Sequence, residues 1–361
     1  MNAIKLLIYR CARATGLFAL ARRITRQRVR MLCYHGGAVS DEHQFNPLLF
    51  CPAEHLDRRL AWLRAAGFTF VGLSAAVEQL RTGCPGPRLP VVVTFDDGWS
   101  STANLLGPVV QRHNVPAALY LCTSHYLSGH AVADVAIGYM VWKAGIGQVL
   151  LAGLAPGLDG AYNFNERGDR KRFIDNAVAW VGAEPRSAPL AQERLMDLAG
   201  ALGLNAEQLA FDSRRFHYVN AEELKRLHAS GWSVELHGHE HRYHAGNAQL
   251  VHADLALCRA ALREAGFTQC HHYCYPSGNH DDAAHVLLAN EDVQSATTCL
   301  PGLAHASQKS HLYYLPRFLD GPNIDDLIFE AEMSGFADGV RWMASLLAPG
   351  RRPTEAARTP G

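Results

Sequence analysis

The sequence predicts an α/β fold built on a parallel sheet. From residue 30 onward, short apolar segments alternate with amphipathic helical segments, which is the pattern of repeated βα units. Residues 91–95 are almost entirely apolar and rich in β-branched side chains, as expected for a strand buried on both faces. Such units form either a closed barrel or an open doubly wound sheet. In both, reactive residues lie at the carboxyl ends of strands.

The expected elements follow one another in a regular order. Strand character is found at residues 31–34, 68–73, 91–95, 117–122, 233–236, 272–275, near 297 and at 313–317. Apolar residues at helical spacing predict helices at 52–66, from 73 to 81, at 105–110, 221–229 and 250–265, after 281, and a long one from 324.

Residues 1–30 concentrate positive charge. They contain eight basic residues and no acidic residue, and Ile4, Leu7, Ile8 and Cys11 recur at helical spacing. This pattern predicts a basic amphipathic helix that either lies on an anionic membrane surface or packs on the domain. The apolar run at 17–20 is too short for a secretory signal. We therefore expect a cytoplasmic protein, peripheral at most on the inner face of the membrane.

Residues 31–347 are expected to form one large α/β domain. Within it, residues 126–216 contain helical segments but no clear strand, so we predict a helical insert that shapes the substrate site. The tail, residues 348–361, is rich in proline and is expected to be disordered.

The composition excludes several classes of protein. Hydrophobic residues make up 48% of the 361 residues and charged residues 19%, as in globular proteins. Outside residues 1–30 the chain has 26 basic against 34 acidic residues. This argues against nucleic acid as a partner, because phosphate contacts need a basic face. Nine cysteines without CxxC spacing indicate reduced thiols rather than a disulfide framework.

Two adjacent carboxylates, Asp96 and Asp97, follow the strand at 91–95. At a strand end they point in different directions, so one can bind a cation while the other acts as a base beside it. Gly98 allows a sharp turn of the backbone. The alternative is that an aspartate here caps the next helix.

A cluster of histidines follows the strand at 233–236. His237 and His241 are four residues apart, with His239 between them. On a turn or helix this spacing places two imidazoles on one side of the backbone. Together with Asp97 they form a set of two histidines and one carboxylate, which leaves coordination positions open, as in catalytic metal sites.

These segments resemble motifs of the polysaccharide deacetylase family, also called the NodB-homology or carbohydrate esterase family 4 group. Residues 94–98 (TFDDG) resemble its first motif, and residues 237–241 (HGHEH) resemble its H-[ST]-x-x-H motif. Residues 274–278 (CYPSG) are similar to the YPxG variant of its third motif. Residues 31–35 and 315–317 resemble segments of one branch. The resemblance covers about residues 31–330, with 126–216 as a departure.

The resemblance implies a distorted (β/α) barrel with seven strands, incompletely closed. It also implies a metal-dependent hydrolase that removes an acetyl or formyl group from an amino sugar in a glycan or glycan precursor. Asp97, His237 and His241 would bind the metal, most commonly Zn²⁺, and Asp96 would be the general base. The backbone at Ser277 would contact the oxyanion. The carbohydrate substrate would also meet Tyr275 and His239.

Three positions depart from the family pattern. Gly238 replaces the Ser or Thr that braces the second motif, so His239 or another group must brace this loop. Cys274 stands where the family has an arginine that orients the base. We predict that Arg317 does this instead, although an ordinary salt bridge is the alternative. The family's late general-acid histidine is missing, and His35 is the candidate replacement. Its alternative is a core histidine bonded to backbone.

Two other functions remain open at this stage. The first is a related metal-dependent amidohydrolase that acts on a small non-sugar amide, because the sequence contains no sugar-specific motif that would exclude it. The second is a glycan-binding module that has lost catalytic activity. Such loss usually removes the metal ligands or the base, but Asp96, Asp97, His237 and His241 are all present.

Overall fold

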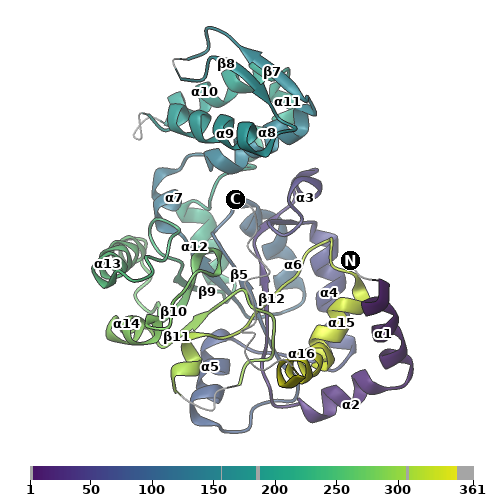
Figure 1. Cartoon of the computed structure of the whole chain (residues 1–361). Coiled ribbons are helices and arrows are strands. Elements are labelled where there is room, and N and C mark those ends of the chain that lie inside the picture. Colours follow the sequence, from purple (N-terminus) through teal and green to yellow (C-terminus); the bar gives the residue numbers. More distant parts are fainter. Residues whose placement is uncertain (1–2, 156, 184–187, 306–308, 348–361) are drawn as a thin grey trace.

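A parallel sheet wrapped by helices forms the body of the protein, and an insert stands over one end of it (Figure 1). The computed structural model describes residues 3–155, 157–183, 188–305 and 309–347. In this part of the chain the main sheet has eight strands, in the order β11-β10-β9-β6-β5-β1-β12 with β4 paired to β5. They are β1 (Arg30–Tyr34), β4 (Thr69–Phe70), β5 (Pro90–Phe95), β6 (Ala117–Leu121), β9 (Ser233–Leu236), β10 (His272–Cys274), β11 (Ser295–Thr297) and β12 (Phe318–Leu319).

The sheet curls into an incomplete barrel, which confirms the predicted fold class. All the pairs within it are parallel. Seven strands follow one another around the curve, and the two ends approach where Thr297 forms an isolated parallel bridge with Leu315. Every residue of β5 is buried, as expected for a strand covered on both faces.

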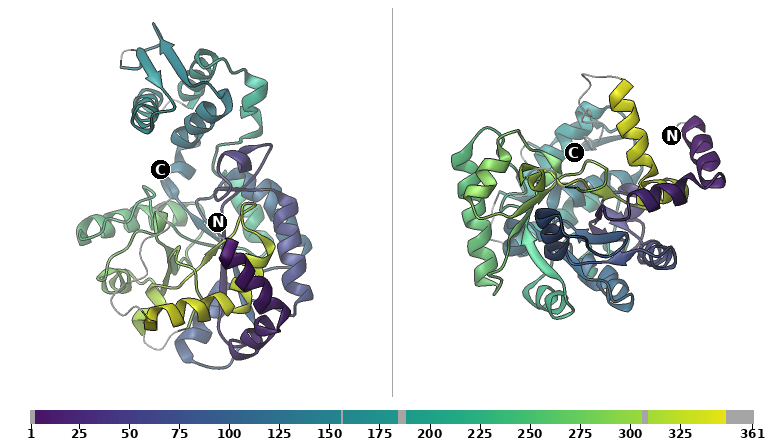
Figure 2. Two further views of the ribbon diagram at one scale, coloured as in Figure 1. Left: turned by 45° about the vertical axis from the view of Figure 1, so that its right-hand side comes forward. Right: turned by 90° about the horizontal axis from the view of Figure 1, so that it is seen from below.

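Helices cover the outside of the barrel (Figures 1 and 2). They are α4 (Ala53–Ala65), α5 (Leu73–Thr82), α6 (Gly107–Arg112), α12 (Ala221–Ala229), α13 (Ala248–Glu264), α14 (Ala284–Asn290), α15 (Asp326–Ser334) and α16 (Phe336–Leu347). The long helix expected from residue 324 is therefore two helices. Gly335 separates them with a φ of 84°, a conformation that ends a helix at little cost only for glycine.

The last strand also differs from the expectation. Residues 313–317 are not a strand; residues Lys309–Tyr313 form a short 3₁₀ helix, and β12 begins at Phe318. The Tyr313 hydroxyl donates a hydrogen bond to the carbonyl oxygen of Val293 (2.8 Å). Within this segment only Leu315 pairs with the sheet, through its isolated bridge to Thr297, and the tyrosines contribute packing instead.

The first residues form two helices rather than one. They are α1 (Ala3–Ala14) and α2 (Leu17–Ile24), separated by Gly16 with a φ of 81°. Tyr9 and Phe18 are buried against Phe336, the first residue of α16. No helix in the described ranges is long and apolar enough to cross a membrane.

The insert at 126–216 contains strands that the sequence did not predict. Between its helices lies an antiparallel hairpin of β7 (Gln148–Leu151) and β8 (Gly160–Asn163). The helices are α7 (Thr123–Ser128), α8 (Ala133–Ala144), α9 (Arg167–Val181), α10 (Ala188–Ala201) and α11 (Ala206–Leu209). Helices α8 to α11 and the hairpin contribute most of a second hydrophobic cluster, separate from that of the barrel. The tail at 348–361 lies outside the described residues.

Candidate active site

The two carboxylates leave β5 in different directions. Tyr34 pairs with Phe95 across β1 and β5, so His35 and Asp96 leave the sheet side by side. Asp97 then adopts a left-handed φ of 71° and Gly98 a φ of 107°. A Cβ at Gly98 would lie 2.2 Å from Cδ1 of Leu121, so only glycine fits there. The turn separates the two side chains, as predicted for two roles.

Asp97, His237 and His241 converge. Oδ1 of Asp97 lies 3.2 Å from Nε2 of His237 and 3.1 Å from Nε2 of His241. Ligands about 2.1 Å from one tetrahedral cation would be separated by about 3.4 Å. The three donor atoms therefore fit a single cation. Asp97 and His237 are buried, whereas the His241 side chain is 34% exposed, so the site opens to solvent beside His241.

Neighbouring groups fix the orientation of these side chains. Nδ1 of His237 lies 3.0 Å from the carbonyl oxygen of Cys274 and donates to it, which turns Nε2 toward Asp97. The Trp99 indole N–H donates to Oδ2 of Asp97 (2.9 Å). Burial would raise the pKa of Asp97, but hydrogen bonds from His237 and His241 outweigh it and hold this pKa well below its ordinary value.

Asp96 is clamped by Arg317. The guanidinium donates from Nη1 to Oδ1 and from Nη2 to Oδ2, both at 2.6 Å. The thiols of Cys33 and Cys274 lie 3.4 and 3.3 Å from Oδ2. Burial would raise the pKa of Asp96, but the charge and hydrogen bonds of Arg317 outweigh it and keep this pKa well below its ordinary value. Arg317 thus lies directly against Asp96, a geometry that fits both the orienting role and the ordinary salt bridge that the sequence left open.

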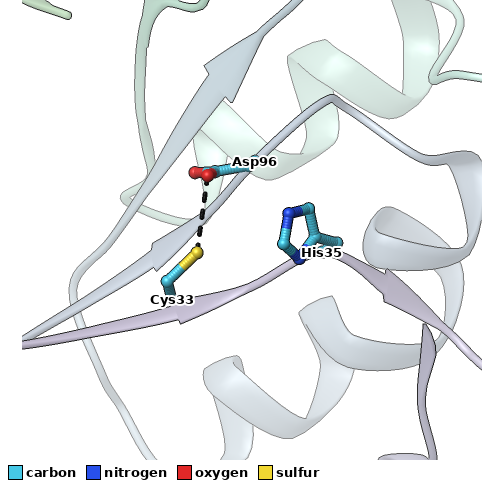
Figure 3. A group of neighbouring side chains, drawn as sticks. All are labelled: Cys33, His35 and Asp96. Carbon is cyan, nitrogen blue, oxygen red and sulfur yellow. Dashed lines mark hydrogen bonds between the residues drawn. The ribbon is translucent and has the colours of Figure 1, made fainter. Parts of the chain in front are cut away.

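His35 lies beside Asp96 (Figure 3). One donor atom from each of Cys33, His35 and Asp96 lies within 4.8 Å of the other two. Nδ1 of His35 is buried and has no hydrogen-bond partner among the described residues. The alternative, a core histidine, requires a hydrogen bond between the ring and the backbone, and Nδ1 makes none in the described part of the chain. The imidazole thus lies close to the Asp96 carboxylate.

The loop of residues 237–241 is braced by Asp254 of α13. Its Oδ2 accepts the N–H of His239 (2.9 Å) and its Oδ1 accepts the N–H of Glu240 (2.9 Å). A Cβ at residue 238 would lie 2.8 Å from Oδ2 of Asp254, which explains the glycine. Nδ1 of His239 lies 2.9 Å from the Thr123 hydroxyl. Sequence reasoning missed Asp254, because nothing in its own segment marks it.

The three residues predicted to contact the substrate lie in different environments. Ser277 is exposed at the carboxyl end of β10, with a left-handed φ of 55°. His239 is half-buried against Thr123. Tyr275 is fully buried, and its hydroxyl donates to the carbonyl oxygen of Tyr313 (3.0 Å). The Tyr275 side chain therefore packs the barrel and offers no accessible atom to a ligand.

Residues that flank the insert reach the candidate metal ligands. Tyr218 packs against Trp99, with ring centroids 4.9 Å apart, and His125 packs against Tyr218 at 5.1 Å. Burial lowers the pKa of His125, and Asp97 and His241 are close enough to influence it. Sequence reasoning did not single out His125, Trp99 or Tyr218. The position of Trp99 two residues after Asp97 was the only available signal.

Comparisons of the sequence agree with the motifs. Residues 201–295 match the family model described as polysaccharide deacetylase. A curated relative, the poly-β-1,6-N-acetyl-D-glucosamine N-deacetylase of Escherichia coli K12, is 34% identical over 79 residues, which are 22% of this chain and 12% of that protein. The similarity thus spans about one eighth of that relative's length.

Comparisons of the structure agree with the fold. The Streptococcus pyogenes deacetylase PplD, solved with acetate, superposes with a TM-score of 0.56 at 15% identity, covering 86% of this chain and 99% of that one. IcaB from Ammonifex degensii gives 0.52 at 17% identity, covering 85% and 97%. A de-N-acetylase from Aggregatibacter actinomycetemcomitans gives 0.53 at 12% identity, covering 84% and 99%. Together these findings confirm the resemblance to the polysaccharide deacetylases.

Proposed function

We propose that this protein is a metal-dependent hydrolase that removes the N-acyl group, acetyl or formyl, from an amino sugar in a glycan or glycan precursor. One observation carries the proposal: Asp97, His237 and His241 converge on a single point while a second carboxylate, Asp96, is held ionised beside them. The match to the N-deacetylase of poly-β-1,6-N-acetyl-D-glucosamine supports an N-acetylated amino-sugar polymer as the substrate.

Each group has a role set by its position. A divalent cation held by Asp97, His237 and His241 would supply Lewis-acid polarisation of the acyl carbonyl and of a water molecule. Asp96 accepts the proton of the attacking water. Arg317 aims the Asp96 carboxylate through two parallel hydrogen bonds. The Ser277 backbone, exposed at the carboxyl end of β10, contacts the carbonyl oxygen.

The leaving amine needs a proton, and in this proposal His35 donates it. Its ring lies beside Asp96, and its buried Nδ1 has no other partner in the described part of the chain. Proton transfer by a positioned side chain typically contributes about 10²–10⁴-fold to the rate. The products are acetate or formate and a free amino sugar, with the water proton taken by Asp96 balanced by the proton that the amine receives.

The test is release of acetate from β-1,6-linked N-acetylglucosamine oligomers, with formate release from N-formyl analogues and a set of small N-acetyl amides measured in parallel. Asp96→Asn should retain the bound cation and lose about 10²–10⁴-fold in kcat. His237→Ala should lose both cation and activity. Asp175→Asn, on the exposed face of α9, is the control and should match the parent protein.

Three results would contradict this proposal. Full activity of Asp96→Asn would exclude it as the base, and full activity of cation-free protein would exclude metal dependence. Activity confined to the small amides would replace the sugar substrate with the alternative of a small-amide hydrolase. Metal analysis of the purified protein identifies the ion, for which Zn²⁺ stays a prediction.

A further inference from the structure

Large apolar side chains are exposed mainly on three helices. Seventeen such side chains are exposed in the described part of the chain, and nine of them lie on α1, α2 and α16. We call these nine the docking face: Ile4, Leu7, Ile8, Leu17, Leu20, Ile24, Trp342, Met343 and Leu346. Scattered exposed leucines are ordinary, but a concentration on adjacent elements marks a surface that binds something.

The apolar residues of α1 lie on two opposite sides of the helix. Tyr9 and Ala12 are only 4% exposed and pack on the barrel, whereas Ile4, Leu7 and Ile8 are 65%, 61% and 51% exposed. Positions i, i+3 and i+4 form one stripe, and this stripe lies opposite the packed side. The two alternatives left open by the sequence are therefore compatible, since packing uses one side of the helix and the other side is exposed to solvent.

The docking face is held in place by tertiary contacts. The rings of Tyr9, Phe18 and Phe336 contact one another, with centroids 5.2–6.3 Å apart. Helix α2 also contacts α1, α15 and α16 directly. Seen from below in Figure 2, α1 and α16 project from the same side of the barrel. The surface is thus preformed and needs no ordering when it binds.

The charge around this face is positive. The acidic residues nearby are each paired with arginine: Glu330 with Arg13 and Arg22, Glu332 with Arg341, and Asp338 with Arg28. Four further cations on or beside α1 and α2 make no ion pair with an acidic residue of the described chain: Lys5, Arg10, Arg23 and Arg26. Exposed aliphatic side chains flanked by unpaired cations complement a surface with negative headgroups above an apolar layer.

We propose that the docking face binds the surface of an anionic phospholipid bilayer, with its apolar side chains in the headgroup region and its four unpaired cations on lipid phosphates. This occupant fits better than a protein, because the positive charge has no matching acid on the face itself to pair with a second copy. Helices α2 and α16 lie at the end of the molecule far from the insert (Figure 1). Docking there leaves the carboxyl ends of the strands open to solvent.

The test is flotation of the full chain with vesicles of phosphatidylcholine alone and of phosphatidylcholine with phosphatidylglycerol at about 3:1. The protein should bind only the anionic vesicles, and high salt should weaken binding. Arg10→Gln with Arg23→Gln should lower the affinity about fivefold for each charge removed. Leu20→Ser with Ile24→Ser, and separately Trp342→Ser with Met343→Ser, should each lower it about tenfold or more.

The matched control is Leu250→Ser with Leu257→Ser, which removes two similarly exposed leucines, 46% and 52%, from α13. It should bind as the parent protein does, and thermal unfolding verifies that every variant is folded. Absence of binding to anionic vesicles overturns the proposal, as does equal binding by the docking-face variants. If light scattering instead finds a dimer that Leu20→Ser with Ile24→Ser dissociates, the face is an interface between copies and the membrane proposal fails.

Discussion

The environment of Asp96 combines two opposing electrostatic effects. A fully buried carboxylate is costly when it is charged, yet Arg317 supplies a full positive charge and two short hydrogen bonds. The guanidinium also donates from Nε to the carbonyl oxygen of Thr298 and from Nη1 to the Thr94 hydroxyl. The arginine is therefore fixed by the barrel itself. It sets both the charge and the direction of the proposed base.

Arg317→Lys should shift the acid limb of the kcat/KM profile to higher pH. Lysine keeps a charge but cannot form the two parallel hydrogen bonds. The pKa of Asp96, now held below its ordinary value, should rise because burial is less compensated. A base with a raised pKa is protonated, and lost, at a higher pH, so we expect a shift of about one pH unit or more. The pH dependence of acetate release measures it.

Arg341→Lys is the control for this variant. Arg341 also forms two hydrogen bonds to one carboxylate, that of Glu332, but on α16, away from the strand ends. The pH profile of kcat/KM for Arg341→Lys should be unchanged. An acid limb that stays in place in Arg317→Lys would mean that the limb reports another group, and that Arg317 is a structural ion pair only.

The residues nearest the proposed chemistry were predictable from sequence, and those behind them were not. Asp96, Asp97, His237 and His241 follow strand ends, and strand ends of a parallel sheet meet at one edge. Trp99 and Asp254 form hydrogen bonds within the same loops, but only the folded conformation of each loop brings them there. Tyr275 shows the converse, since its motif position suggested a ligand contact and packing buried it.

Among the elements, α13 determines the shape of the loop of residues 237–241, which carries the candidate metal ligands. His241 has a left-handed φ of 52°, a conformation that costs a non-glycine residue about 1 kcal/mol or more. The two hydrogen bonds that Asp254 accepts from the loop backbone offset part of this cost. They also join α13 to the histidines that would hold the cation.

Asp254→Asn should weaken cation binding by about 10–100-fold, the usual effect of removing a partner that orients metal ligands. An amide has one acceptor oxygen, so one of the two loop N–H groups would face its NH₂ and lose its hydrogen bond. We also expect a loss of about 1–3 kcal/mol in the free energy of unfolding. Calorimetric titration with Zn²⁺ and urea denaturation measure the two effects.

Glu264→Gln, at the exposed end of the same helix, controls for the charge change. It should change neither the cation affinity nor the free energy of unfolding by more than a small fraction. Cation affinity equal to that of the parent protein in Asp254→Asn would show that the loop holds its shape without this brace.

Elements with strong periodicity were predicted well, and short or irregular ones were not. Helix α4 and strand β5 agree with the expectation to within one or two residues. Strand β12 has only two residues, too few to carry a pattern. The hairpin of β7 and β8 has strand residues that are mostly exposed or half-buried, so its sequence lacks the apolar alternation that identifies a strand.

At the scale of the whole molecule, a buried ion pair ties the insert to the barrel. Nε of Arg215, at the end of the insert, donates to Oε1 of Glu42, the first residue of α3 (Glu42–Phe45) (2.6 Å), and both side chains are at most 1% exposed. Asp41 accepts a second hydrogen bond from Arg215 (3.0 Å). These partners are 173 and 174 residues apart in sequence, so no local pattern could have paired them. The sequence predicted the insert as an interruption of the βα pattern, but it did not predict how the insert is attached to the barrel.

Arg215→Met should cost about 3–5 kcal/mol in the free energy of unfolding, because it leaves the Glu42 carboxylate buried without its partner. Replacing both members, Glu42→Leu with Arg215→Met, should recover much of that loss, since two apolar side chains need no compensation. Lys171→Met, which breaks an exposed pair on α9, is the control and should change stability by no more than about 0.5 kcal/mol. Urea denaturation measures all three. If Arg215→Met unfolds at the same urea concentration as the parent protein, the insert is held to the barrel by its hydrophobic contacts, and the pair contributes only to orientation.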